Sequence, residues 1–134
     1  MKIKYFISNI NDLNIIIKKP SLVFLKWDLW AWKTTISKYI INKLLEKKQN
    51  ITSPTYTYYN KYNDIYHFDL YRLKDYNEFF AIGAEDILDN NDGVILVEWP
   101  ELIEKYYKPD IEIILKKTDN EDEREIEVNY SKLW

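Results

Sequence analysis

Two continuous apolar runs, Ser21–Lys26 (SLVFLK) and Val94–Val97 (VILV), constrain the fold of this chain more than any other feature. A strand without polar alternation must be covered on both faces, which is typical of a parallel sheet between layers of helices. Between the two runs, apolar residues recur at helical spacing, at Ile36, Ile40, Ile41, Leu44 and Leu45. A buried strand, a loop and an amphipathic helix in that order predict an α/β fold.

Shorter signals place the remaining elements. No repeat, low-complexity tract or Gly/Ser/Pro linker divides the sequence, so we expect a single domain over residues 1–134. The further expected elements are a strand at Met1–Ile7, a helix from Ser8 or Asn9 to about Lys19, a hairpin of Tyr56–Lys61 and Ile65–Tyr71, helical structure over 75–89 with a break at Gly83, and an antiparallel pair of Asp110–Lys117 and Arg124–Tyr130.

Composition excludes several classes of protein. One His and no Cys rule out disulfides and the ordinary zinc and iron–sulfur sites. The net charge is −3, with ten Lys against three acidic residues in 1–50 and nine basic against nineteen acidic residues in 51–134. An acidic chain is not typical of a free-standing nucleic-acid binder. The apolar runs are too short for a membrane span, so we expect a cytoplasmic protein.

The loop after the first apolar run has the form of a phosphate-binding loop without its glycines. Residues 27–34 read WDLWAWKT, and Gly in place of Trp27 and Trp32 would give G-x-x-x-x-G-K-T. In that loop backbone N–H groups cradle phosphates, the Lys reaches the terminal phosphates and the Thr hydroxyl binds magnesium. The chain has only two Gly, where average usage would give roughly nine.

Four segments together resemble one family. They are WDLWAWKTT at 27–35, SPTYT at 53–57, HFDLYRL at 67–73 and VEWP at 97–100. Their order and spacing resemble TsaE, the small P-loop ATPase of bacterial tRNA threonylcarbamoyladenosine synthesis, whose pattern includes GDLGAGKTT, SPTYT, HFDLYRL and VEWP. The resemblance covers about residues 20–130. It implies a P-loop NTPase-like three-layer sandwich, with a mixed sheet of parallel core strands and antiparallel hairpins.

The resemblance also implies a site for ATP and Mg²⁺. The implied nucleotide-binding residues are Trp27, Asp28, Leu29, Trp30, Ala31, Trp32, Lys33, Thr34, Thr35, Thr55 and Arg124. Thr34 and Glu98 would hold magnesium, and Asp69 and Glu98 would support hydrolysis as metal ligand or base. Each residue has an ordinary alternative: a solvent-exposed strand end for Glu98, a structural hydrogen bond for Asp69, and loop capping for Thr55. For His67, packing within a strand is the favoured interpretation.

Trp27, Trp30 and Trp32 stand at the three glycine positions of the family's loop. The chain is rich in Lys, Ile, Asn and Tyr, which fits an A+T-rich gene. Our hypothesis is that the three tryptophans are UGA codons that the source organism reads as glycine. The loop needs glycine where the chain adopts positive φ and approaches phosphate without a Cβ. We therefore expect the Trp form to bind ATP poorly, because of backbone strain or exposed aromatic surface at these positions.

The resemblance implies TsaD and TsaB as protein partners, with tRNA engaged indirectly and no membrane involved. ATP turnover would reset the tRNA-modifying complex between cycles. Two other interpretations stay open. If the tryptophans are genuine, the chain could be a nucleotide-free scaffold of the same fold. Alternatively, Trp27, Trp30 and Trp32 could stack on the bases of single-stranded RNA, although the acidic charge disfavours this.

Overall fold

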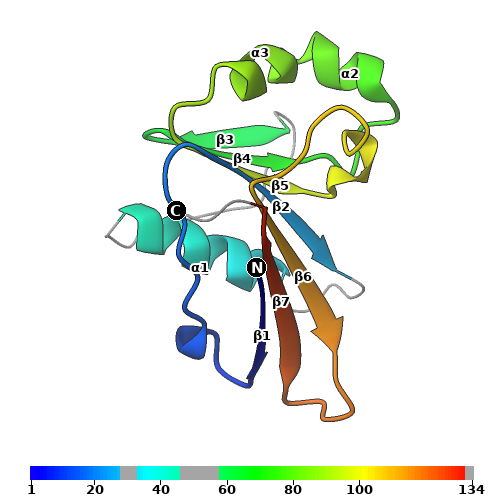
Figure 1. Ribbon diagram of the computed structural model, residues 1–134. Coiled ribbons are helices and arrows are strands. Elements are labelled where there is room, and N and C mark those ends of the chain that lie inside the picture. Colours follow the sequence, from blue (N-terminus) through cyan, green and yellow to red (C-terminus); the bar gives the residue numbers. More distant parts are fainter. Residues whose placement is uncertain (28–32, 46–57, 132–134) are drawn as a thin grey trace.

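The computed structural model describes residues 1–27, 33–45 and 58–131 and contains one seven-stranded sheet (Figure 1). The elements are β1 (Lys2–Ile7), η1 (Ile10–Asp12), β2 (Ser21–Trp27), α1 (Lys33–Leu45), β3 (Tyr59–Tyr62), β4 (Ile65–Asp69), α2 (Tyr76–Ala81), α3 (Ala84–Asp89), β5 (Val94–Glu98), η2 (Pro100–Leu102), β6 (Ile111–Lys117) and β7 (Arg124–Tyr130). The strand order across the sheet is β1-β7-β6-β2-β5-β4-β3.

The sheet is mixed, as predicted. β2 pairs in parallel with β5 on one side and with β6 on the other, and β5 pairs in parallel with β4. The outer pairs, β3 with β4, β6 with β7 and β7 with β1, are antiparallel. Both apolar runs of the sequence therefore lie in the parallel centre of the sheet, where a strand is covered on both faces.

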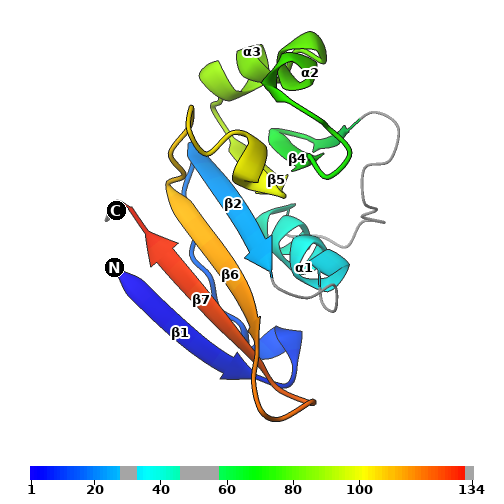
Figure 2. The ribbon, with the colours of Figure 1, turned by 90° about the vertical axis from the view of Figure 1, so that its right-hand side faces the viewer.

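Alternate residues of the central strands enter two different cores. Val23 and Leu25 belong to the core that also holds Ile36 and Ile40 of α1. Phe24, between them, belongs to the core that holds Phe79 of α2 and residues of α3. Figure 2 shows α1 beside the sheet and the α2–α3 pair near its β4 end. The sheet thus lies between two helical layers, which confirms the predicted three-layer fold.

The helix predicted from Ser8 or Asn9 to about Lys19 is wrong. The Asn9 side chain does accept a hydrogen bond from Asn11 N, but only the single turn η1 follows it. Beyond η1, tyrosine hydroxyls take the backbone groups that a helix would pair: Tyr5 donates to Asn14 O at 2.7 Å, and Ile16 N donates to the Tyr130 hydroxyl at 3.3 Å. Tertiary hydrogen bonds thus satisfy this backbone in an irregular conformation.

Other boundaries differ by a few residues. The strand predicted at Ile65–Tyr71 ends at Asp69, and part of the strand predicted at Tyr56–Lys61 lies outside the described residues. The predicted break at Gly83 is confirmed, since Gly83 has φ +81° between α2 and α3. Within the described part of the chain, no helix is long and apolar enough to cross a membrane.

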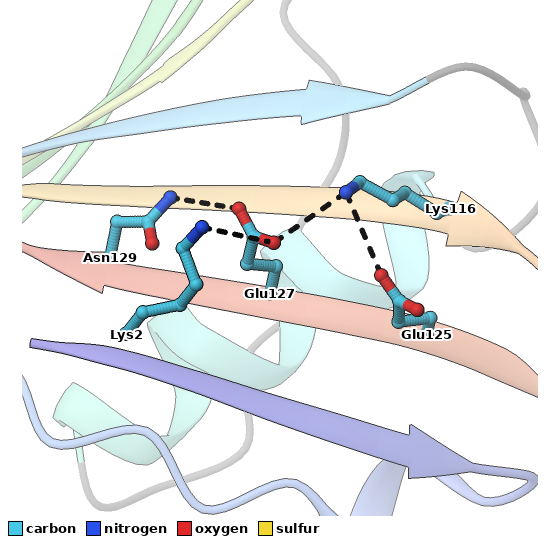
Figure 3. A network of polar contacts seen from close by, with 5 residues as sticks. All are labelled: Lys2, Lys116, Glu125, Glu127 and Asn129. Carbon is cyan, nitrogen blue, oxygen red and sulfur yellow. Dashed lines mark hydrogen bonds and ion pairs between the residues drawn. The ribbon is translucent and has the colours of Figure 1, made fainter.

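The β1–β7–β6 part of the sheet carries a polar network on the face turned away from α1 (Figure 3). At its centre, Glu127 accepts a hydrogen bond from Asn129 Nδ2 at 3.0 Å. The Glu127 carboxylate also lies 3.5 Å from Lys116 Nζ and 3.9 Å from Lys2 Nζ. The Glu127 side chain is only 7% exposed, so these partners offset the cost of burying a charge.

Candidate functional site

Three parallel strands end at one edge of the sheet and bring predicted site residues together there. β2 ends at Trp27, β4 at Asp69 and β5 at Glu98. Asp69 and Glu98 are register partners on neighbouring strands, so their side chains leave the sheet on the same face. α1 covers that face and begins at Lys33, shortly after β2. The carboxyl edge of parallel strands is where open α/β sheets bind ligands.

Glu98 is completely buried at this edge. Its exposed fraction is 0%, and its Oε1 accepts a hydrogen bond from the Ser37 hydroxyl of α1 at 2.8 Å. Ser37 is itself 0% exposed. The alternative of a carboxylate in solvent at a strand end is therefore wrong for Glu98, because β5 delivers it beneath the first turns of α1.

His67 lies on the other side of the same carboxylate. Its ring is 1% exposed, and Nε2 lies 3.1 Å from Glu98 Oε2, within ion-pair distance. The contact lacks hydrogen-bond geometry, and neither His67 ring nitrogen nor Glu98 Oε2 has a hydrogen-bond partner within the described part of the chain. The expected packing of His67 within a strand is confirmed, since it lies buried in β4.

Asp69 is half-buried and makes a structural hydrogen bond, the alternative to a catalytic role that the sequence left open for this residue. Its Oδ1 accepts from the backbone N–H of Tyr71 at 3.1 Å, which stabilises the turn after β4. This hydrogen bond and a role at the strand edge are compatible, because a carboxylate has four acceptor sites on its two oxygens.

Aromatic side chains surround the edge. The Trp27 and Trp99 rings meet edge to face, with centroids 6.2 Å apart, and Tyr71 packs on Trp99 at 5.2 Å. Of the described residues other than glycine, Tyr58, Asn63 and Trp99 have a positive φ. Trp27 instead continues the ladder of β2 opposite Leu115 of β6 and is half-buried. The backbone strain expected from a tryptophan at position 27 is not present in this structure.

The other predicted nucleotide-binding residues divide into two groups. Asp28, Leu29, Trp30, Ala31, Trp32 and Thr55 lie outside the described residues, as do the side chains of Lys33 and Thr34. Thr35 is exposed on the first turn of α1. Arg124 begins β7 and donates to the carbonyls of Glu121 and Glu123 at 2.6 and 2.9 Å. β7 lies three strand spacings from β5, about 14 Å, so Arg124 is not beside Glu98.

The described carboxylates at this edge are too few to hold a metal by themselves, but they fit the chemistry of magnesium. Within the described ranges, no group of three or more His, Cys, Asp or Glu side chains could hold a metal ion. Magnesium is usually held by one or two carboxylates together with hydroxyl, phosphate and water oxygens. Glu98 fits this chemistry because its Oε2 carries no hydrogen bond.

Sequence reasoning did not assign a role to Ser37. The available signal was a polar residue on the buried face of α1, between Ile36 and Ile40, one helical turn after Thr34.

A cavity of about 260 Å³ lies away from this edge, between residues 14–17 and the part of α1 from Tyr39 to Leu44. Its lining is mostly apolar, and it contains none of the predicted site residues.

Comparisons with known proteins agree with this geometry. The model of the family described as "Threonylcarbamoyl adenosine biosynthesis protein TsaE" matches residues 5–126. A Rickettsia prowazekii protein named tRNA threonylcarbamoyladenosine biosynthesis protein TsaE is 38% identical over 109 residues, which cover 78% of this chain and 74% of that protein. A Haemophilus influenzae protein of the same name is 36% identical over 120 residues, with 87% and 74% covered.

The fold also matches a solved structure. The crystal structure of Bacillus subtilis YdiB superposes with a TM-score of 0.67 at 29% identity, over 98% of this chain and 87% of that one. The family model matches most of the chain, and the relatives named above are more than one-third identical to it. Together these findings establish the family. The chain belongs to the TsaE family.

Proposed function

We propose that this chain is the ATP-binding and ATP-hydrolysing subunit required for threonylcarbamoyladenosine modification of tRNA. Its membership of the TsaE family supports the role in tRNA modification. The order of a buried strand, a loop and a helix that opens with Lys33 and Thr34 supports the nucleotide chemistry. The observation that carries the proposal is the buried carboxylate of Glu98, which ends the neighbouring strand beneath the first turns of α1.

Each residue at the edge has a role in this proposal. The first-turn N–H groups of α1 and the Lys33 side chain would bind the phosphates, since a helix N-terminus favours anions. Thr34 and Glu98 would hold magnesium, which when bound supplies positive charge against the phosphates. Asp69, on the next strand, would orient the attacking water. Trp99, which follows Glu98, would exclude bulk solvent from this edge.

The reaction would serve a larger assembly. We propose that TsaD and TsaB are the protein partners and that ATP turnover resets their complex between cycles of tRNA modification. The chain would engage tRNA only through those partners, because its net charge of −3 gives no general attraction for phosphate. The assembly would act in the cytoplasm.

Titration calorimetry with Mg-ATP tests the nucleotide site. The experiment uses the chain as written and a Trp27→Gly, Trp30→Gly, Trp32→Gly variant. We expect micromolar binding by the glycine variant and binding at least roughly tenfold weaker by the Trp form, a difference of about 1.4 kcal/mol. Equal affinity would contradict the assigned role of the glycines. No binding by either protein would overturn the proposed ATPase function.

A nucleotide-free scaffold is the second candidate, and one observation favours it. Trp27 fits the ladder of β2 without a positive φ and packs against Trp99. A genuine tryptophan is therefore accommodated at the first of the three glycine positions. Sequencing the gene separates the two candidates, because UGA at codons 27, 30 and 32 supports glycine in the natural protein, whereas UGG supports the scaffold.

A further inference from the structure

The contact between Ser37 and Glu98 joins two elements that are far apart in sequence. The hydroxyl of Ser37 on α1 donates to Oε1 of Glu98 at the end of β5, at 2.8 Å and across 61 residues. Both residues are 0% exposed. The contact is thus a buried hydroxyl–carboxylate pair between the helical layer and the sheet.

Stability alone does not explain this pair. A buried carboxylate is costly even when it is hydrogen-bonded, and apolar residues of similar size in such a place are often equally stable or more stable. β5 supplies the contrast, since Val94 and Leu96 on the same face of that strand pack in the α1 core with 0% exposure. A polar pair that continues an apolar row indicates a need for the carboxylate itself.

Only one of the two oxygens of Glu98 is fixed by a hydrogen bond. Oε1 accepts from Ser37, whereas Oε2 lies 3.1 Å from His67 Nε2 without hydrogen-bond geometry and has no other hydrogen-bond partner within the described ranges. The Ser37 hydroxyl therefore supplies the hydrogen bond that fixes the rotation of the carboxylate, while His67 Nε2 lies against its other oxygen. Oε2 keeps acceptor capacity for a further ligand, which would lie beside His67.

The place of Ser37 on α1 relates this contact to the nucleotide site. Ser37 follows Thr34 by one helical turn, so positions 34 and 37 lie on the same side of α1. In the proposed function Thr34 is a magnesium ligand. The hydrogen bond from Ser37 therefore fixes Glu98 to α1 one turn after that ligand. The attachment is to a helix backbone, which is more rigid than a loop.

We propose that Ser37 is a positioning residue for Glu98: its hydroxyl holds Oε1 and so presents Oε2 toward the magnesium–nucleotide site. That the Glu98 carboxylate binds magnesium rests on the proposed ATPase function. That the Ser37 hydroxyl fixes the orientation of this carboxylate does not. Ser37 itself touches neither nucleotide nor metal in this proposal. It acts through the orientation of one carboxylate.

The hold of Ser37 on Glu98 is tested without nucleotide. Carbon-13 NMR of chain labelled at the Glu side-chain carboxyl carbon, with Glu98→Gln to assign the signal, reports on this group alone. In Ser37→Ala we expect the Glu98 signal to shift or broaden, and in Ser37→Thr to return toward its original position because the hydroxyl is restored. Ser21→Ala removes an equally buried serine at the opposite end of β2 and should leave the signal in place. An unchanged signal in Ser37→Ala would overturn the proposal.

The consequence for magnesium is tested in the Trp27→Gly, Trp30→Gly, Trp32→Gly background. We expect Ser37→Ala to reduce the gain in ATP affinity that Mg²⁺ provides by roughly tenfold, the scale of a hydrogen bond to a charged group. Added to Glu98→Gln, the same substitution should have no further effect, because Ser37 acts only through that carboxylate. Equal effects of Ser37→Ala in both backgrounds would contradict the positioning role. If Mg²⁺ changes ATP affinity in no variant, the proposed function fails, and the NMR result alone decides whether Ser37 holds Glu98.

Discussion

Trp27 at the end of β2 packs edge to face against Trp99, with an interplanar angle of 90° and ring centroids 6.2 Å apart. Such a contact contributes about 1 kcal/mol beyond the apolar area that it buries. Position 27 is also the first glycine position of the phosphate loop in the family's pattern. The tryptophan thus stabilises the edge of the sheet. In the proposed function nucleotide binding would require a small residue at this position, so stability and binding would oppose each other there.

Trp27→Gly should therefore destabilise the chain as written. We expect a loss of about 2 kcal/mol in the free energy of unfolding, from the aromatic contact and the added freedom of the unfolded chain. Urea unfolding followed by far-UV circular dichroism measures this loss. Trp27→Phe keeps an aromatic ring at this position and should lose less than half as much. A Trp27→Gly protein as stable as the parent would show that the contact contributes nothing in solution.

Glu98→Gln should separate stability from catalysis. The amide retains an acceptor for the Ser37 hydroxyl and removes a buried charge, so we expect the free energy of unfolding to stay within about 1 kcal/mol of the parent. When Glu98→Gln is added to the Trp27→Gly, Trp30→Gly, Trp32→Gly variant, the rate of ATP hydrolysis should fall at least about a hundredfold. A steady-state phosphate-release assay measures the rate. Glu112→Gln changes a carboxylate of β6 away from the site and serves as the control, and an unchanged rate in Glu98→Gln would rule out its catalytic role.

The two glycines in the sequence should respond differently to alanine. A Cβ at Gly93 would lie 2.0 Å from the backbone oxygen of Asp64, so Gly93→Ala must displace the β3–β4 turn. We expect a loss of more than about 3 kcal/mol or failure to fold. A Cβ added at Gly83 would meet no atom within 4 Å beyond the adjoining residues, but φ is +81°. Gly83→Ala should therefore cost only about 1 kcal/mol. Thermal unfolding of both variants measures the difference, and similar melting temperatures would contradict the packing at Gly93.

Glu127 should give the protein a pH-dependent contribution to stability. The hydrogen bond from Asn129, followed by the charges of Lys116 and Lys2, lowers the pKa of Glu127 below its ordinary value of 4.5 despite burial. A carboxyl whose pKa is lower in the folded state contributes fully above 4.5, and this contribution disappears as the pH falls through the folded-state value. Asn129→Ala should therefore destabilise the protein more at neutral pH than in acid, by about 1–2 kcal/mol at pH 7.

Urea unfolding of Asn129→Ala between pH 3 and pH 7 measures this dependence. In a Glu127→Gln background the effect of Asn129→Ala should no longer vary with pH, because the titrating partner is gone. A loss of stability that is the same at every pH in the parent background would show that Asn129 acts only by packing.

Much of the fold follows from local spacing in the sequence. The apolar runs Ser21–Lys26 and Val94–Val97 predict central strands, and they pair in parallel as expected. The break at Gly83 and the last hairpin are also confirmed. The exception is residues 9–19, where apolar residues and a good cap predict a helix. Hydroxyl groups of Tyr5 and Tyr130 bind that backbone instead, and Tyr130 is distant in sequence.

The candidate site was likewise predictable from the sequence only in part. The sequence by itself determined that an acidic residue ends β5 and that a Lys-Thr pair follows a buried strand at the start of a helix, because such strand ends and helix starts are encoded within a few residues. That Asp69 ends β4 came from the structure, since the sequence predicted a strand continuing to Tyr71. Only the tertiary structure decided that Glu98 is buried and that Ser37 and His67 lie against its two oxygens. These contacts span 61 and 31 residues of chain. They exist because the parallel sheet and the packing of α1 bring distant side chains into one desolvated place, which no local spacing records.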